Sequence, residues 1–338
     1  MADALISPAV GGVMTAVSAA ALGYGVHQMG KDGLSEKKIP LMGVMGAFVF
    51  AGQMINFTIP GTGSSGHIGG GILLAALLGP FPALLVLASV LLIQCLFFAD
   101  GGLLALGCNV FNMGFISCVL AYSFVFKPIV KNGMDKRRIT AASVAAVVLG
   151  LQMGAFAVVL ETITSGVAAL PFGTFILLMQ PIHLAIGIVE GLVTAAALCY
   201  VQSVRPEILE SASHNALIPA AIPMKKIIVS FLVLTALTGG LLSIFASAYP
   251  DGLEWSLEGA AGTAEFEQEG SVYRAAGTAV ETTAFMPDYG FTGAEEGSAL
   301  GTATAGITGS LITIALAGGI GLIIHLTRKK KAGSQISA

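Results

Sequence analysis

The stretch HIGGGILLAALLGPFPALLVLASVLLIQCLFFAD runs from His67 to Asp100 and carries no lysine, arginine, aspartate or glutamate before its last residue. It holds two apolar runs, at 69–80 and 82–98, which meet at a Gly-Pro-Phe-Pro sequence. A transmembrane helix needs about 20 apolar residues, so the first run is too short for a full crossing. Half-length helices in membrane proteins usually line a cavity, where irregular backbone is tolerated. The stretch therefore predicts a membrane protein with a short helix beside an internal cavity.

The rest of the chain has the same apolar character. Of its 338 residues, 55% are apolar and 10% are charged, whereas a soluble domain carries about 25% charged residues. This composition excludes a soluble globular enzyme and a disordered protein. The formal net charge of −3 excludes a nucleic-acid-binding protein, because it offers no basic surface to phosphates. We therefore expect an all-α polytopic protein that spans the lipid bilayer of the cell membrane.

Seven further apolar runs accompany this pair. They lie at 8–29, 40–58, 102–126, 139–163, 172–202, 227–248 and 302–327. Lysines and arginines cluster after the first, fifth, seventh and ninth of the nine runs, at 31–38, 127–138, 205–226 and 328–331. These clusters fall on one side of the membrane only if the short run counts as a crossing. The positive-inside rule then predicts an N-terminus outside and a C-terminus in the cytoplasm.

A polar linker at 203–226 divides the runs into two groups. Residues 1–202 form a predicted seven-helix module, and 227–338 form a two-helix module that encloses a large loop on the outside, at 249–301. The loop has one base, Arg274, and ten acids: Asp251, Glu254, Glu258, Glu265, Glu267, Glu269, Glu281, Asp288, Glu295 and Glu296. It is either a solvated acidic linker or an electrostatic funnel that concentrates cations near the membrane. Both interpretations stay open.

The densest group of polar residues surrounds the second and third runs. Gln53 and Asn56 precede the loop PGTGSSGH at 60–67, whose glycines allow the backbone to fold tightly. His67 ends this loop on the outer side, and its glycine neighbours let it face a cavity. A lone histidine is more often structural, but imidazole is also the commonest side-chain ligand of late first-row metals. His67 is therefore the first candidate for a metal ligand.

Two enzymatic interpretations of the same loop differ in strength. The loop resembles a phosphate cradle, but GxxxxGK[ST] does not occur in the 338 residues, so no nucleotide hydrolysis is expected. Gly-Ser-Ser-Gly at 63–66 matches the GxSG pattern of intramembrane serine proteases, with Ser65 as nucleophile and His183 as base. Such a tetrapeptide arises easily in any turn rich in glycine and serine. The protease remains an alternative to a loop without enzymatic activity.

A second polar pair lies in the seventh run. His183 and Glu190 are seven residues, or two helical turns, apart and therefore share one face. A carboxylate inside a membrane is costly and is a functional candidate. We prefer the interpretation that these two side chains form hydrogen bonds to each other or to a neighbouring helix. Direct contact with a metal ion is the second interpretation. Asp100 and Glu161 lie at the ends of runs and are expected to reach water.

Several longer motifs resemble the substrate-capture M component of cobalt/nickel energy-coupling factor (ECF) transporters. They are FAGQMINF at 50–57, PGTGSSGHIGGG at 60–71, FADGGLLALG at 98–107, FNMG at 111–114 and the segment 183–191. The C-terminal hairpin is similar to the companion N subunit, fused in place. Its motifs are PDGLE at 250–254 and PDY at 287–289. The resemblance covers nearly the whole chain.

This resemblance implies a component of an ABC-type importer that captures Co(II) or Ni(II) outside the cell. A transmembrane coupling (T) subunit and cytoplasmic ATPase subunits would be separate chains, and no intrinsic cofactor is implied. The family's metal site uses the N-terminal amine, the next amide nitrogen, a histidine at position two and the histidine that matches His67. Four nitrogen donors suit a square-planar late metal, and the sequence does not distinguish cobalt from nickel.

The chain departs from this pattern at position two, which is Ala2. Residues 2–8 align with the segment that normally follows Met-His and one further residue, so we expect the natural start to lie two residues upstream. Among the residues present, the resemblance makes Met1 and His67 the metal ligands. The side chains expected to hold the amine and the imidazole in place are Asp3, Gln53, Asn56 and Ser65. We expect the fused hairpin to assist metal loading and not to ligate, because its acids are oxygen donors.

Overall fold

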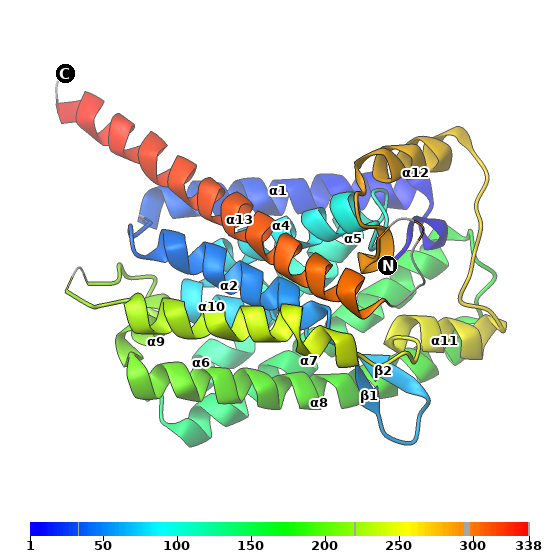
Figure 1. Ribbon diagram of the computed structural model, residues 1–338, viewed down its shortest axis with the longest axis horizontal. Coiled ribbons are helices and arrows are strands. Elements are labelled where there is room, and N and C mark those ends of the chain that lie inside the picture. Colours follow the sequence, from blue (N-terminus) through cyan, green and yellow to red (C-terminus); the bar gives the residue numbers. More distant parts are fainter. Residues whose placement is uncertain (33, 220, 292, 294–297, 337–338) are drawn as a thin grey trace.

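The computed structural model describes residues 1–32, 34–219, 221–291, 293 and 298–336 as a bundle of long helices (Figure 1). The N-terminus lies at one end of the bundle, together with a β-hairpin and the helices α11 and α12, whereas the C-terminus lies at the opposite end. Glu295 and Glu296 of the acidic loop lie outside the described residues, as do the side chains of residues 329–331.

A helix occupies each of the nine predicted apolar runs. They are α1 (Pro8–Asp32), α2 (Lys38–Gln53), α3 (Gly71–Leu78), α4 (Pro80–Phe98), the continuous rod of α5 (Leu106–Asn109), η2 (Val110–Phe126) and α6 (Lys127–Val130), α7 (Lys136–Ser165), α8 (Phe172–Val204), α10 (Lys225–Gly240) and α13 (Ala299–Ile336). Over the described residues, six are long and apolar enough to cross a membrane: α1, α4, the rod, α7, α8 and α13. The prediction of an all-α polytopic membrane protein is confirmed.

The short helix α3 is limited by glycines at both ends. Gly70 precedes it with φ +79°, and a Cβ there would lie 2.7 Å from the side chain of Val49. Gly79 ends it with φ +90°, and Pro80 then begins α4. Only glycine adopts such backbone angles without strain. All eight residues of α3 are buried, so this helix lies inside the protein and faces no lipid.

The fused C-terminal helices pack closely against α2 and each other. A Cβ on Gly239 of α10 would lie 3.1 Å from the carbonyl group of Gly306 on α13, so the two backbones touch. Gly309 of α13 faces the ring of Phe50 on α2 in the same way. Inside a membrane the hydrophobic effect does not drive helices together. Small residues at the interface let the backbones approach closely, so that van der Waals packing holds the helices together.

The chain between α2 and α3 forms a hairpin that was not predicted. Strands β1 (Phe57–Ile59) and β2 (Ser64–Gly66) are antiparallel, with Phe57 opposite Gly66. Gly61 and Gly63 turn the chain with φ +79° and +73°. The predicted run 40–58 therefore ends early, at Gln53, because Pro60 and the two glycines favour a turn.

The acidic loop is folded, although the sequence predicted only a loop. It contains α11 (Gly252–Ala261), α12 (Ser271–Thr283) and the short turn η4 (Pro287–Tyr289). Asp251 and Glu254 form a capping box at the start of α11. The ring of Tyr289 stacks on Phe98 at 5.0 Å between centroids, and its hydroxyl donates to Asp100. These contacts hold the loop against the bundle. The remaining short helices of the chain are η1 (Asp3–Leu5), α9 (Pro206–Ser213) and η3 (Leu242–Phe245).

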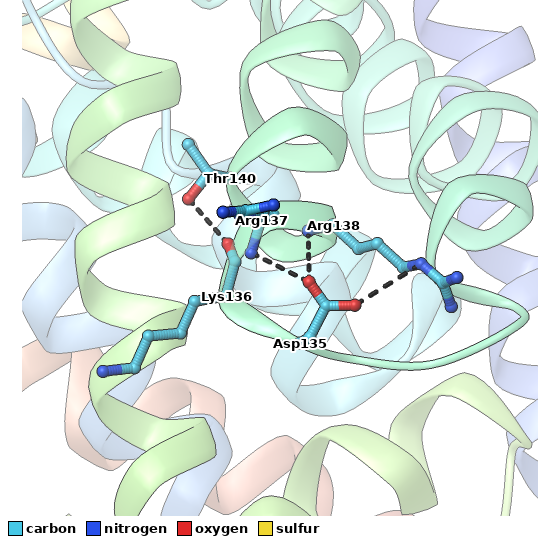
Figure 2. A network of polar contacts seen from close by, with 5 residues as sticks. All are labelled: Asp135, Lys136, Arg137, Arg138 and Thr140. Atoms are coloured by element: carbon cyan, nitrogen blue, oxygen red, sulfur yellow. Dashed lines mark hydrogen bonds and ion pairs between the residues drawn. The ribbon is translucent and has the colours of Figure 1, made fainter.

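Helix α7 begins at an aspartate cap in a basic segment (Figure 2). The Asp135 carboxylate accepts hydrogen bonds from the backbone N–H groups of Arg137 (3.0 Å) and Arg138 (3.1 Å). The Arg138 guanidinium also lies 3.4 Å from this carboxylate, but both side chains are largely exposed. An exposed ion pair contributes little, so the cap is the stabilising feature.

We expect Asp135→Ala to lower the free energy of unfolding by about 1 kcal/mol, because two N–H groups lose their acceptor. Asp135→Asn keeps an acceptor and should cost less than half as much. Thermal unfolding of the purified protein in detergent measures the stability, and amide exchange at Arg137 and Arg138 measures the cap locally. Equal losses for the two variants would show that the ion pair matters and the cap does not.

Candidate metal site

A cavity of about 140 Å³ lies at the end of the bundle that holds the N-terminus. Its walls come from α3, η2, α7 and α8, from the end of β2 and from the segment that begins α11. Its polar side chains are those of Asn109, Asn112, Ser117, His67, His183, Glu190 and Asp251, and Met1 and several glycines also line it. Among the described residues, no lysine or arginine lines it. The volume accommodates several waters or a partly hydrated cation.

His67 reaches the cavity because the end of the hairpin packs against α8. A Cβ on Gly66 would lie 2.5 Å from the side chain of Ile186, so only glycine allows this approach. The Nδ1 atom of His67 is buried and has no hydrogen-bond partner in the described structure. No hydrogen bond within the described residues engages either ring nitrogen of His67.

Met1 lies at the same cavity because the N-terminal segment is tied to the start of the rod. Its carbonyl oxygen accepts hydrogen bonds from the Gly102 N–H at 3.3 Å and from Asn109 Nδ2 at 3.2 Å. The Asp3 carboxylate accepts the Ala105 N–H at 2.8 Å. Burial raises the pKa of Asp3, and its hydrogen bonds and the N-terminal amine oppose that rise. Asp3 does not line the cavity, and it acts by anchoring the segment that carries Met1.

Glu190 and Gln53 hold the backbone between His67 and α3. Glu190 is 3% exposed, and its Oε1 accepts the Gly70 N–H at 2.8 Å. Gln53 Nε2 donates to the carbonyl of Gly69 at 2.9 Å. The second carboxylate oxygen of Glu190 is buried and has no partner among the described residues. The glycines after His67 are thus fixed from two sides.

Ser65 and His183 are not arranged as a catalytic pair. The Ser65 side chain is fully buried and donates to the Tyr249 carbonyl at 2.8 Å. His183 bonds the Met179 carbonyl of its own helix through Nδ1 at 2.8 Å, which requires a proton on Nδ1. Within the described residues no hydrogen bond joins the serine to the histidine. A nucleophile activated by a base needs such a bond or a short approach to it.

The segment 247–255 of the fused module lies along the β-hairpin and closes the cavity. The Ser65 N–H donates to the Pro250 carbonyl at 2.8 Å, and the Trp255 indole donates to the Thr62 carbonyl at 3.0 Å. A Cβ on Gly252 would lie 3.2 Å from Cε1 of His183, so the segment sits directly on α8. Asn56 contacts this segment through its backbone carbonyl, which accepts the Ser247 N–H at 2.7 Å.

Asp251 and Asn112 are lining residues that the sequence did not identify as site residues. Asp251 was visible as one of the ten acids of the loop and as part of the PDGLE motif, and its spacing to Glu254 indicates a helix cap without placing it at a cavity. Asn112 Nδ2 donates to Glu161 at 2.7 Å. The expectation that Glu161 reaches water is wrong, because α7 and η2 bury it to 7% exposure.

The structure therefore separates the predicted site residues into two groups. Met1, His67, His183 and Glu190 line one cavity. Asp3, Gln53, Asn56 and Ser65 lie behind its walls and position the segments that form them. The described residues contain no cluster of three or more histidine, cysteine or acidic side chains suited to a metal ion.

Comparisons with known proteins match both parts of the chain. Residues 1–208 match the family profile of the cobalt uptake substrate-specific transmembrane region, CbiM. Residues 225–326 match the PDGLE domain. A putative fused nickel transport protein NikMN of Archaeoglobus fulgidus is 32% identical over 318 residues, which cover 93% of this chain and 95% of that protein.

Two further comparisons cover the first part of the chain. A cobalt transport protein CbiM of Sorangium cellulosum is 32% identical over 190 residues, 54% of this chain and 81% of that protein. The crystal structure of a transition metal transporter superposes with a TM-score of 0.53 at 29% identity, over 60% of this chain and 92% of the other. The chain belongs to the CbiM family of cobalt uptake substrate-specific transmembrane regions and carries a fused PDGLE domain.

Proposed function

We propose that this chain is the substrate-binding membrane component of a cobalt/nickel importer. The observation that supports this most directly is the convergence of Met1 and His67 on one cavity that no described lysine or arginine lines. Relatives of the chain carry the names of cobalt and nickel transport proteins. The substrate is a Co(II) or Ni(II) ion that enters from outside, at the end of the bundle that holds the N-terminus.

The donor atoms suit these ions. The amine of Met1 and Nε2 of His67 are borderline nitrogen donors, which late first-row metals prefer over the oxygen donors suited to magnesium or calcium. A dication among apolar helices also needs negative charge nearby. Glu190 and Asp251 line the cavity and supply that charge, and Glu161 lies directly behind Asn112.

The energy for transport comes from other chains in this proposal. The 338 residues contain no GxxxxGK[ST] motif. A transmembrane coupling subunit and cytoplasmic ATPases would bind the complex and drive release of the metal on the cytoplasmic side. Residues 1–202 act as the capture module, 203–226 as a cytoplasmic linker and 227–338 as the fused module.

The fused module assists loading of the metal. Its segment 247–255 covers the cavity, and its helix α12 is tied to the N-terminal segment by the Tyr273 hydroxyl, which donates to the Ile6 carbonyl at 3.0 Å. Its excess of acids attracts cations to this end of the bundle. The module thus gathers the cation and holds the segment that carries Met1.

We expect His67→Ala to weaken Ni(II) binding by more than about 100-fold, because loss of an outer partner alone costs 10–100-fold. Ser65→Ala removes one hydrogen bond, worth about 1 kcal/mol, and should change the affinity by at most about fivefold. Calorimetry with nickel chloride on the purified chain measures both. Peptide cleavage that Ser65→Ala abolishes, with nickel binding unchanged in His67→Ala, would favour the intramembrane protease instead.

Tyr273→Phe should weaken Ni(II) binding by about fivefold, because it removes a hydrogen bond worth about 1 kcal/mol from the N-terminal segment. Tyr249→Phe is the matched control: its side chain is 53% exposed and its hydroxyl makes no hydrogen bond in the described structure. The affinity and the initial rate of uptake at limiting nickel should fall in the first variant only. Identical values in both variants would contradict a role of the fused module in loading.

A further inference from the structure

Two of the buried polar atoms in the cavity wall that lack a hydrogen-bond partner in the described structure complement each other. Nδ1 of His67 is buried without a hydrogen bond, and so is Oε2 of Glu190. One is a ring nitrogen that can carry a proton, and the other is an acceptor. Buried polar groups are nearly always paired, so two such orphans in one cavity require an explanation.

The backbone places these two side chains together. The Glu190 carboxylate bonds the Gly70 N–H at 2.8 Å, three residues after His67. A Cβ on Gly69, two residues after His67, would lie 3.4 Å from Oε2 of Glu190. The unpaired oxygen therefore lies close to Gly69. His67 is also within electrostatic range of Glu190. A rotation of the imidazole about its side-chain torsions would therefore bring Nδ1 toward the free oxygen of Glu190.

We propose that Glu190 is a positioning residue for the metal ligand His67, an inference that rests on the proposed function. When the metal is bound, Oε2 of Glu190 accepts the Nδ1–H of His67, while Oε1 keeps its bond to Gly70. The proton is then fixed on Nδ1, and Nε2 presents its lone pair to Co(II) or Ni(II). Ligating histidines commonly donate their second N–H to a carboxylate, which orients the ring and raises its basicity.

Two other carboxylates near the cavity are placed differently. Asp251 caps α11 through the N–H groups of Leu253 and Glu254. Glu161 accepts from the Asn112 amide at 2.7 Å through Oε2, and its Oε1 is also buried without a partner in the described structure, but Glu161 does not line the cavity. Glu190 is thus the acid whose free oxygen is both buried and close to the loop that carries His67. It reaches this position because α8 runs beside the glycines that follow the histidine.

The first experiment compares Glu190→Gln with wild type by calorimetry, with nickel chloride and the purified full chain. Glutamine keeps a side-chain oxygen for the Gly70 N–H, so metal-free thermal unfolding should stay close to wild type. The dissociation constant should rise 10–100-fold. Glu210→Gln is the matched control, because Glu210 is exposed on α9 at the opposite end and should bind nickel as wild type does. An unchanged affinity in Glu190→Gln would overturn the proposal.

The second experiment detects the proton on Nδ1 of His67 directly. In chains labelled with ¹⁵N-histidine and loaded with nickel, the His67 ring should show an Nδ1–H that exchanges slowly with water, assigned by its absence in His67→Ala. Glu190→Gln should lose this protection. A loaded wild type without a protected Nδ1–H, or with the proton on Nε2, would overturn the role of Glu190 even if the glutamine variant fails to fold. Failure of wild type to bind nickel at all would instead refute the proposed function.

Discussion

The hydrogen bond from the Gly70 N–H to the Glu190 carboxylate holds together the part of the molecule that matters for function. A carboxylate inside an apolar bundle must be paired, and this bond pairs it with the backbone at the start of α3. It joins the short buried helix to α8 and fixes the glycines that follow His67. The start of this short helix lines the cavity through Ile72, together with the glycine-containing segment that precedes it.

The second constraint is the junction between the two parts of the chain. The Ser65 backbone and side chain bond the carbonyls of Pro250 and Tyr249, and Trp255 bonds the hairpin turn. These bonds place an acidic segment over a cavity whose remaining walls come from residues 1–202. Glycine contacts between α2 and α13, at Gly43 and Gly309, support the same association within the bundle. Because both parts belong to one chain, the segment 247–255 stays beside the cavity that it closes.

Much of the fold followed from the sequence, and the exceptions have physical causes. Every predicted apolar run contains a helix, because lipid-spanning backbone has to satisfy its own hydrogen bonds. The hairpin at 57–66 was not predicted, since its strands are only three residues each and carry little periodicity. The helices of the acidic loop were missed because they are only 10 and 13 residues long and carry few large apolar side chains. Glu161 was placed in water because its position near the end of a run does not reveal the neighbouring helix that covers it.

The sequence by itself determined the membrane class, the positions of the helices and the candidacy of Met1 and His67, because composition, apolar run length and motif are local properties. That these two residues ligate the metal stays a prediction. Only the tertiary structure decided that Met1, His67, His183, Glu190 and Asp251 surround one cavity. It also decided that Gln53 and Ser65 support the walls and do not line them. These residues come from distant parts of the chain, and their meeting depends on which helices pack together and on the glycines that let them approach.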